Sequence, residues 1–395
     1  MNYDYDVAVI GAGPIGSSLA CQLASSNVKV ALIDKKKQVG LPLQCAGIIN
    51  KRILKFHDIP EDIILNQAEG AYIHGRNHAI KVSKDEPQAL IIDRVAFDQH
   101  LFKKAQESGA DAFLSSKVLD MDPEEGTVLF KTSDGEKTIR SKIIVGADGP
   151  MSLVSQKIGN EFKAYNASQY LVKVKGIDEM SFVDLYAKEE LWPGFLWCIP
   201  TYDNIFRIGL FSNEDYRKQD EILDDFLEND FIYEEYEVLE KYKGQIPIHD
   251  ADKNLVKGRT LLIGDAASQV KPTTGGGLLL GSQAVSIACK AILEALKKDD
   301  LSLLENYQKD FDKKFSSEFS YQIKVQKSLS TFSDDDLDEM LETIKKRKID
   351  KLISEYGDMD DQSILVKEML KRGLILPLLP KLHKKELARI WLLNI

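Results

Sequence analysis

A glycine pattern near the start of the chain constrains its fold more than any other feature. It consists of an apolar run, three spaced glycines and a helix-forming segment: Val7 to Ile10, then Gly11, Gly13 and Gly16, then residues 17–24. A second apolar run, residues 28–33, ends on Asp34. A strand, a glycine turn, a helix and a second strand in this order predict the βαβ unit of a Rossmann-like α/β domain.

The same spacing predicts a ligand at this turn. Gly11 permits the tight turn, Gly13 lets the backbone approach a pyrophosphate, and Gly16 lets the helix pack closely on the strand. Free N–H groups at a helix start attract phosphate. Asp34 follows about 20 residues later, where an acid accepts ribose hydroxyls. We therefore predict a bound adenine dinucleotide, with Ile15 in its loop; the alternative is a tight turn without a ligand.

Composition narrows the class of protein. The 395 residues carry a formal net charge of −10, which argues against a nucleic-acid partner. The four cysteines lie far apart, so neither a disulfide framework nor a metal site is expected; they are Cys21, Cys45, Cys198 and Cys289. The first residues contain no basic segment of a signal peptide. The uncharged windows 7–28 and 272–289 are rich in Gly, Ser or Thr and predict buried helices rather than membrane spans. We expect a cytoplasmic protein.

Two further motifs place polar groups beside the dinucleotide. Arg94 stands at the start of an amphipathic helix, where its guanidinium can hold a pyrophosphate bidentately. The alternative for Arg94 is an ion pair with Asp93 or Asp98. Asp148 follows a buried strand and can accept hydrogen bonds from the cofactor or fix the arginine; the alternative is a turn that ends the strand. Val118, on another predicted strand, is also assigned to the cofactor site.

A third motif extends the prediction from a dinucleotide to FAD. Asp265 ends an apolar strand and can hold a ribityl hydroxyl. Gly275, Gly276 and Gly277 precede a long helix that starts at Leu278. Bare N–H groups at a helix start stabilise negative charge at the N1–C2=O edge of reduced flavin. Three glycines in a row are conformationally costly, which indicates that the close approach serves a ligand.

Together these motifs resemble the flavoproteins that include para-hydroxybenzoate hydroxylase, and more closely the geranylgeranyl reductase family with its archaeal digeranylgeranylglycerophospholipid reductases. The run Pro272-Thr-Thr-Gly-Gly-Gly277 is similar to that family's Pro-x-Thr-Gly-Gly-Gly. Leu41-Pro-Leu-Gln-Cys45-Ala-Gly47 resembles its Pro-x-x-Cys-Gly loop. Trp192-Pro-Gly-Phe-Leu-Trp-Cys-Ile-Pro200 resembles its Pro-x-Tyr-x-Trp-x-Phe-Pro substrate motif. The resemblance covers nearly the whole chain.

The resemblance implies roles for two segments. Cys45, Ala46 and Gly47 would lie against the flavin, where the Cys45 thiol donates a proton or shapes the cavity. Phe195 and Trp197 would line the substrate pocket. Three positions depart from the family pattern: Phe195 replaces Tyr, Ile199 replaces Phe, and Ala46 replaces Gly. The missing phenol puts proton delivery by a tyrosine in doubt. The alternatives are a buried filler for Cys45 and ordinary sheet core for the aromatic residues.

The function that this resemblance implies is reduction of C=C bonds in geranylgeranyl chains of an isoprenoid lipid or prenyl diphosphate, with hydride from flavin N5. NAD(P)H and a ferredoxin-type partner both stay open as electron donors. An FAD monooxygenase of aromatic substrates is the first alternative. An electron-transfer flavoprotein that reduces quinone is the second, although four separated cysteines do not supply its usual iron–sulfur cluster.

We expect three parts in the chain. Residues 1–65, 94–160 and 255–300 form a discontinuous FAD-binding domain, residues 66–93 and 161–254 a β-rich substrate domain, and residues 301–395 a helical C-terminal region. The acidic stretch 214–240 reads as a surface helix, and Ser333 caps another helix. The apolar segment 374–380 is followed by lysines and predicts either helix packing or peripheral contact with a membrane surface.

Overall fold

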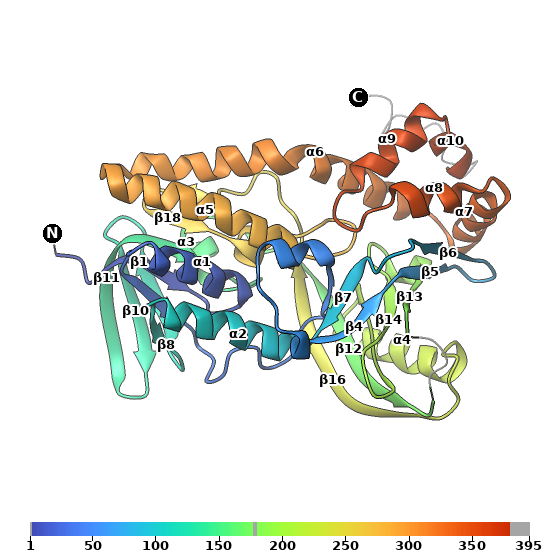
Figure 1. Ribbon diagram of the computed structural model, residues 1–395, viewed down its shortest axis with the longest axis horizontal. Coiled ribbons are helices and arrows are strands. Elements are labelled where there is room, and N and C mark those ends of the chain that lie inside the picture. Colours follow the sequence, from blue (N-terminus) through green and yellow to red (C-terminus); the bar gives the residue numbers. More distant parts are fainter. Residues whose placement is uncertain (1, 177–179, 380–395) are drawn as a thin grey trace.

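Three sheets organise the part of the chain that the computed structural model describes, residues 2–176 and 180–379 (Figure 1). The eight-stranded sheet has the order β17-β18-β11-β1-β2-β8, and β10 joins β11 to β9. Its strands are β1 (Tyr5–Ile10), β2 (Val30–Ile33), β8 (Asp111–Phe113), β9 (Lys117–Asp122), β10 (Thr127–Thr132), β11 (Gly135–Gly146), β17 (Val256–Lys257) and β18 (Thr260–Leu262).

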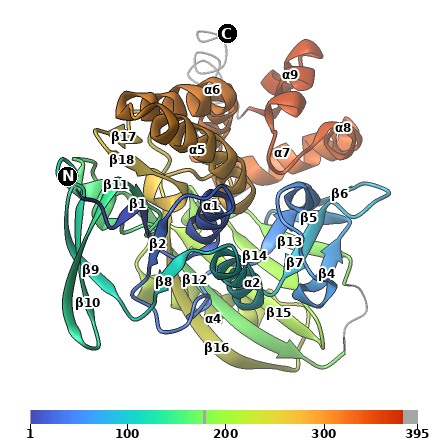
Figure 2. The same ribbon diagram turned by 60° about the vertical axis from the view of Figure 1, so that its left-hand side comes forward.

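Parallel pairing explains the apolar sequences of this sheet. β1 lies between β2 and β11, and all three run in the same direction. Val7, Val9 and Leu32 are fully buried, as expected for strands covered on both faces. The helices α1 (Pro14–Ser25), α2 (Arg94–Glu107) and α5 (Leu278–Lys298) lie together over one face (Figure 2). The first prediction, a Rossmann-like α/β domain opened by a βαβ unit, is confirmed.

The seven-stranded sheet has the order β16-β12-β15-β14-β13-β5-β6. Its strands are β5 (Gly70–His74), β6 (Ala79–Ser83), β12 (Ala164–Val174), β13 (Phe182–Tyr186), β14 (Leu196–Pro200), β15 (Ile205–Ser212) and β16 (Tyr236–Pro247). The outer face packs on α4 (Tyr216–Asn229) through an apolar cluster that includes Tyr170, Ile208 and Phe226. The opposite face, called the inner face below, turns toward the FAD-binding segments.

A three-stranded sheet connects these two parts. It consists of β3 (Ile48–Asn50), β7 (Ala89–Ile92) and β4 (Ile64–Ala68), in that order. The 3-10 helices η1 (Lys51–Lys55) and η2 (Glu61–Ile63) precede β4. Ile92 and Ile53 are fully buried beside Phe97 of α2. The small sheet therefore carries the chain from the first βαβ unit to the seven-stranded sheet and back.

The C-terminal part of the described chain is helical. Its helices are α6 (Glu305–Leu329), α7 (Asp334–Lys346), α8 (Ile349–Tyr356), α9 (Ser363–Lys371) and α10 (Ile375–Leu378). α5 and α6 run along the top of Figure 1, and α7 to α10 lie above β5 and β6. Ser333 caps α7 in a capping box with Asp336, which confirms the predicted cap.

Among the described residues, one helix, α5, is long and apolar enough to cross a membrane by length and composition. Of its most apolar window, 61% is buried inside the protein, and α5 packs against both α1 and α6. It serves here as a core helix, in agreement with the interpretation of the window 272–289. The lysines that follow the apolar segment 374–380 lie outside the described residues.

The prediction for residues 214–240 is wrong in its second half. α4 ends at Asn229, and β16 begins at Tyr236 and pairs along its length with β12. The acidic side chains favour an exposed helix locally. Alternate positions such as Tyr236 and Val238 nevertheless pack on the apolar cluster of the outer face, so sheet pairing overrides the local preference.

We propose the three-part division for the domains. Strands from residues 70–83 and 164–247 share one sheet, because β5 pairs with β13. This pairing supports assigning 66–93 and 161–254 to one substrate domain, beside the FAD-binding segments 1–65, 94–160 and 255–300.

Candidate functional site

The glycine turn after β1 has the geometry that a pyrophosphate requires. Gly11 has a φ of +104°, and a Cβ there would overlap the carbonyl of Ala147. A Cβ on Gly16 would overlap the carbonyl of Gly11. By contrast, a Cβ on Gly13 would meet no protein atom within 4 Å. Gly11 and Gly16 are therefore required by the protein's own packing, whereas the space over Gly13 is open to a ligand.

Ile15 and Val118 differ in their surroundings. Ile15 fills the space left by two glycines, since a Cβ on Gly281 would lie 2.5 Å from Ile15 Cδ1 and one on Gly264 3.3 Å from its Cγ atoms. Val118 is in β9 opposite Phe130 and packs against the core of the large sheet. Ile15 thus joins α1 to α5; cofactor contact by either residue stays a prediction.

Asp34 is held beside the glycine turn. Its carboxylate accepts hydrogen bonds from the backbone N–H of Ala12 at 2.7 Å and of Lys36 at 2.8 Å. The side chain is half-buried, so oxygen lone pairs stay accessible to a ribose. The predicted role is compatible with this position.

Arg94 forms an ion pair inside its own helix. Its Nε and Nη2 lie 3.1 and 3.0 Å from Asp98 Oδ1, and Nη2 lies 3.1 Å from Oδ2. Burial by itself lowers the pKa of Arg94, but the charges of Asp98 and Cys45 and the hydrogen bonds to them together outweigh it and raise the pKa above its usual range. The alternative ion pair is therefore present. Contact with a pyrophosphate would use the remaining N–H groups.

Asp148 caps a short helix in the described structure. Its carboxylate accepts hydrogen bonds from the Ser152 hydroxyl at 2.5 Å and the Leu153 N–H at 2.7 Å, at the start of α3 (Leu153–Lys157). Burial raises its pKa against the effect of these bonds. This arrangement matches the strand-ending turn, and Arg94 pairs with Asp98 rather than with Asp148.

Asp265 has the opposite situation, because none of the described residues donates a hydrogen bond to its carboxylate. It lies in the 3-10 helix η4 (Gly264–Ala267), directly after β18. Burial raises its pKa, and Arg94 acts in the opposite direction. A Cβ on Gly277 would lie 3.2 Å from Asp265 Oδ1. A half-buried acceptor without a donor is suited to a ligand hydroxyl.

The glycine run ends in an uncapped helix start. Gly277 is the N-cap of α5 and supplies no side chain to the free N–H groups, and the helix continues from Leu278. Gly275 has a φ of +68°, and a Cβ there would lie 2.9 Å from Ile246 of β16. A Cβ on Gly276 would lie 2.8 Å from Lys271 Cε. The run therefore brings bare backbone to the edge of the seven-stranded sheet.

These observations test whether FAD fits the described residues, and it does. Two helices, α1 and α5, begin at glycine without a side-chain cap, which suits a pyrophosphate and an electron-rich ring edge. Asp34 and Asp265 offer acceptors for ribose and ribityl hydroxyls. The open space over Gly13 admits the phosphates.

The Cys45 loop lies across the inner face of the seven-stranded sheet. Its carbonyls accept hydrogen bonds from two buried strand residues: Gln169 Nε2 reaches the Cys45 oxygen at 3.4 Å, and Arg207 Nη1 reaches the Ala46 oxygen at 2.9 Å. The Cys45 Sγ accepts the Gly47 N–H at 3.4 Å. Gly47 has a φ of +71°, and a Cβ there would overlap Arg207. The loop is therefore fixed from the sheet side.

Aromatic and aliphatic side chains cover the rest of the inner face. Phe195 packs edge-on against Trp197, with ring centroids 6.1 Å apart, and both join one buried cluster with Ile199 and Phe211. Trp197 Nε1 donates to Gln169 Oε1 at 3.2 Å. One hydrogen-bonded chain thus links Trp197, Gln169 and the Cys45 loop. Cys198 faces the other way, into the outer cluster.

Sequence reasoning missed Gln169 and Arg207. Both occupy inward positions of strands whose inward neighbours are apolar, and both are buried, at 6% and 4% exposure. A polar residue at an inward position of a strand was the available signal. It is weak without knowledge of which strands are neighbours.

The C-terminal region fastens the loop that leads to the glycine run. Lys271 Nζ lies 2.7 Å from Asp360 Oδ1 and donates to the Met359 oxygen at 2.8 Å. Gln362 Nε2 donates to Thr273 Oγ1 at 2.8 Å. Met359 packs against the buried cluster of the inner face. We call residues 358–362 the clasp.

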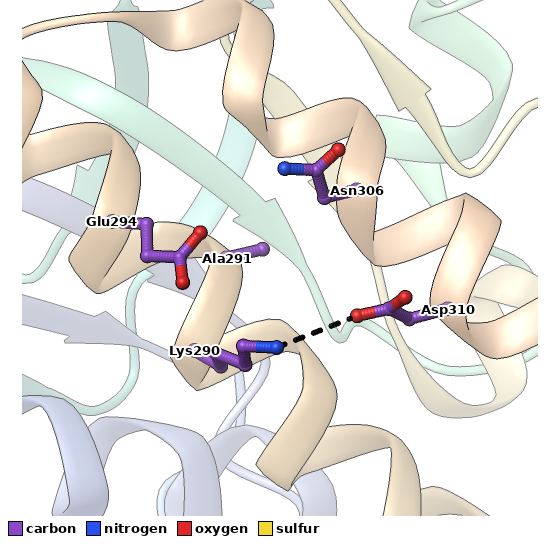
Figure 3. Close-up of a pocket in the computed structure, with 5 residues that line it drawn as sticks. All are labelled: Lys290, Ala291, Glu294, Asn306 and Asp310. Carbon is purple, nitrogen blue, oxygen red and sulfur yellow. Dashed lines mark ion pairs between the residues drawn. The ribbon is translucent and has the colours of Figure 1, made fainter.

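A separate pocket of about 210 Å³ lies between α5 and α6 (Figure 3). Lys290 and Asp310 face each other across it, 3.8 Å apart. None of the predicted site residues lines it. Charges of both signs and an open position distinguish it from the FAD site.

Fold and site together define a flavoprotein of the para-hydroxybenzoate hydroxylase type with FAD as its cofactor. Residues 4–314 match the FAD binding domain family, so the chain belongs to that family. Within it, the chain is similar to proteins named as geranylgeranyl reductases.

Three comparisons describe this similarity. The chain is 31% identical over 374 residues to an uncharacterized protein of Methanocaldococcus jannaschii. The matched region covers 93% of this chain and 95% of that protein. It is 29% identical over 367 residues to digeranylgeranylglycerophospholipid reductase 1 of Methanococcoides burtonii, with 87% and 88% coverage. A geranylgeranyl bacteriochlorophyll reductase-like protein of Thermoplasma acidophilum superposes with a TM-score of 0.84 at 22% identity, over 98% and 99% of the chains. At that identity the superposition shows the fold alone.

Proposed function

We propose that this protein reduces C=C bonds in geranylgeranyl chains of an isoprenoid lipid or a prenyl diphosphate. The observation that carries the proposal is the inner face, where Phe195, Trp197 and Ile199 lie beside the Cys45 loop. A prenyl chain offers almost nothing polar to bind, so its site must be apolar and close-fitting. The relative from Methanococcoides burtonii is named a reductase of such a lipid, which supports the same substrate class.

Each residue of this wall has a defined task in the proposal. Bound FAD supplies the hydride, from its N5 atom. Trp197 holds the alkene in position and excludes water, and Phe195 and Ile199 extend the apolar surface along β14. Gln169 fixes both the Trp197 indole and the Cys45 carbonyl. The Cys45 thiol, at the edge of this surface, delivers the proton or shapes the cavity.

Phe195 cannot take the role of proton donor that a tyrosine at this position could have. A phenylalanine carries no proton to donate, so the proton must come from Cys45 or from water at the mouth of the site. Phe195 instead contributes ring contacts to Trp197 and to Phe211, with centroids 5.3 Å apart in the second case. Its task in the proposal is to shape the apolar wall of the substrate site.

A single-turnover experiment tests the proposal. The FAD-loaded protein is reduced with dithionite, freed of excess reductant and mixed anaerobically with a geranylgeranyl lipid. We expect reoxidation of the flavin together with mass increases of two hydrogens in the lipid. The matched control is the same lipid with saturated chains, which should leave the flavin reduced. Reoxidation that requires oxygen and hydroxylates an aromatic compound instead would assign the protein to the monooxygenases.

A further inference from the structure

Arg207 is a buried cation on the inner face, next to the Cys45 loop. It lies on β15 opposite Ile199 of β14 and is 4% exposed. Directly opposite residues of neighbouring strands share a face, which places Arg207 on the side of the sheet that carries Trp197. Nη1 donates to two backbone oxygens, those of Ala46 and Ile92, each at 2.9 Å.

Unlike the other buried cations of the site, Arg207 has no carboxylate partner among the described residues. Arg94 pairs bidentately with Asp98, and Lys271 pairs with Asp360. Arg207 forms no ion pair within residues 2–176 and 180–379. Burial lowers its pKa, yet a guanidinium stays protonated in proteins. A full positive charge therefore remains at this point of the inner face.

Its hydrogen-bonding capacity is also only partly used. A guanidinium has five N–H donors, and the two bonds to carbonyls use Nη1 alone. Nε is buried without a partner, and no described residue accepts a hydrogen bond from Nη2. Removing a charge from water without a counter-charge is costly. Two neutral carbonyls offset only part of that cost.

The charged and titratable groups around Arg207 do not provide a free counter-charge. The charged or titratable groups nearest Arg207 are Cys45, Asp93, Arg94 and Tyr242. Asp93 is committed elsewhere, because its carboxylate caps α2 through the N–H groups of Val95 and Ala96. The remaining neighbours belong to the Cys45 loop, to α2 and to β16, the strand that also touches Gly275.

We propose that Arg207 binds an anion at the junction of the Cys45 loop and the inner face. Of its two unused nitrogens Nε is fully buried and Nη2 is not, so contact with a ligand uses one or two N–H groups of Nη2. The ligand therefore presents a single anionic edge. Two sources have this chemistry: the reduced flavin, and an acidic head group of the substrate. The proposal rests on FAD binding and on the inner face, and it stands whichever prenyl lipid is reduced.

The first arm of the test uses sulfite, which adds to N5 of oxidised flavin and leaves a negative charge on the ring. We compare the wild-type holoprotein with Arg207→Gln, which keeps a donor for Ala46, Arg207→Met and Arg207→Lys. If the flavin is the anion, sulfite binding weakens about tenfold in the Gln and Met variants. The two-electron potential then falls by about 30 mV, the equivalent of a tenfold change in an equilibrium constant. Arg207→Lys retains the charge and stays close to wild type.

The second arm uses inorganic diphosphate and geranylgeranyl diphosphate as probes of a head group. If the substrate supplies the anion, their affinity falls about tenfold in the Gln and Met variants, while sulfite binding is unchanged. Arg259→Met is the matched control, since Arg259 also donates to the carbonyls of Glu124 and Lys142 but lies at the far edge of the large sheet. Circular dichroism and FAD content check folding, and Arg207→Gln suffices if Arg207→Met does not fold.

Two results would overturn the proposal. In the first, sulfite affinity, flavin potential and diphosphate affinity all stay at wild-type values in a folded Arg207→Gln protein. In the second, Arg207→Lys is as impaired as Arg207→Met, which would mean that the shape of the guanidinium and not its charge matters. Arg207 would then be only a brace for the Cys45 loop.

Discussion

Trp197 lies between Phe195 and Ile199 on β14, with its indole N–H bound to Gln169. We predict that Trp197→Ala keeps FAD and loses about a hundredfold in the rate of lipid reduction. A displacement of the alkene by about 1 Å is sufficient for such a loss. The measurement is single-turnover reoxidation of reduced flavin by a geranylgeranyl lipid. Phe195→Tyr should be tolerated or should raise the rate.

Trp192→Ala is the matched control for Trp197→Ala. Trp192 packs with the C-terminal helices and donates its N–H to the Phe332 oxygen at 2.9 Å, away from the inner face. Removing a buried aromatic such as Trp197 costs on the order of 3–5 kcal/mol of folding stability, and Trp192 is half-buried, so both variants must first be shown to fold. A Trp197→Ala protein that reacts as fast as wild type would remove the inner face from the substrate site.

His57 provides a prediction on pH. Its ring is buried beside Phe97 and lies 2.8 Å from the Ser282 hydroxyl of α5, and burial lowers its pKa from 6.5 to about 4. The unfolded chain therefore binds a proton between about pH 6.5 and pH 4 that the folded protein does not bind. Stability must fall as pH decreases through this window. The expected loss between pH 7 and pH 5 is about 2 kcal/mol from this residue.

Urea denaturation at the two pH values measures this effect. His57→Gln keeps a donor for Ser282 and cannot titrate, so its unfolding free energy should change by about 2 kcal/mol less than that of the wild type between pH 7 and pH 5. His100 serves as the control, because it is more exposed and bonds to the Asp58 carbonyl. An identical pH dependence in His57→Gln and wild type would contradict the prediction.

At the scale of elements, two glycines at the start of α1 have different roles: Gly13 is predicted to serve ligand binding, and Gly16 serves packing. Gly13 has a φ of −65°, which an alanine adopts without strain, and a Cβ there meets no protein atom. We predict that Gly13→Ala leaves the stability of the FAD-free protein within about 0.5 kcal/mol of wild type but weakens FAD binding at least tenfold. Gly16→Ala, where a Cβ overlaps the Gly11 carbonyl, should instead destabilise the fold itself.

Thermal unfolding of the FAD-free proteins and fluorescence titration with FAD separate these two effects. Gly277→Val belongs to the same test at the start of α5, where a side chain would press on Asp265 and should lower FAD retention. Unchanged FAD affinity in Gly13→Ala would show that no phosphate approaches this glycine.

The elements also show what a sequence can reveal. The βαβ unit and the capped α7 depend on local signals, and both were predicted. β16 was missed because its identity depends on pairing with β12, distant in sequence. Arg207 was missed for the same reason: it is recognised as a site residue through its hydrogen bond to the Ala46 carbonyl, which lies more than a hundred residues earlier in the chain.

At the scale of the whole molecule, the clasp ties the C-terminal region to the loop before the glycine run. Lys271 and Asp360 have side-chain exposures of 9% and 13%, and leaving one buried charge unpaired costs about 3–5 kcal/mol. We predict that Asp360→Asn speeds FAD release and makes residues after 330 sensitive to protease. Asp335→Asn is the control, because Asp335 is 89% exposed in its pair with Arg76 and should change little.

Limited proteolysis and stopped-flow release of FAD distinguish the two variants. If Asp360→Asn releases FAD at the wild-type rate and is as resistant to protease as the wild type, the clasp does not stabilise the glycine run.

The order of strands in the large sheet has a consequence for synthesis of the protein. β1 and β11 pair early in the chain, but β18 joins them only after β12 to β16 of the seven-stranded sheet have intervened, and α5 follows still later. A nascent chain thus exposes one edge of its first sheet while more than a hundred further residues are translated. Gly275 to Gly277, the predicted flavin contact, follow that interval. We therefore expect the cofactor to be captured late in synthesis, after the seven-stranded sheet has been translated.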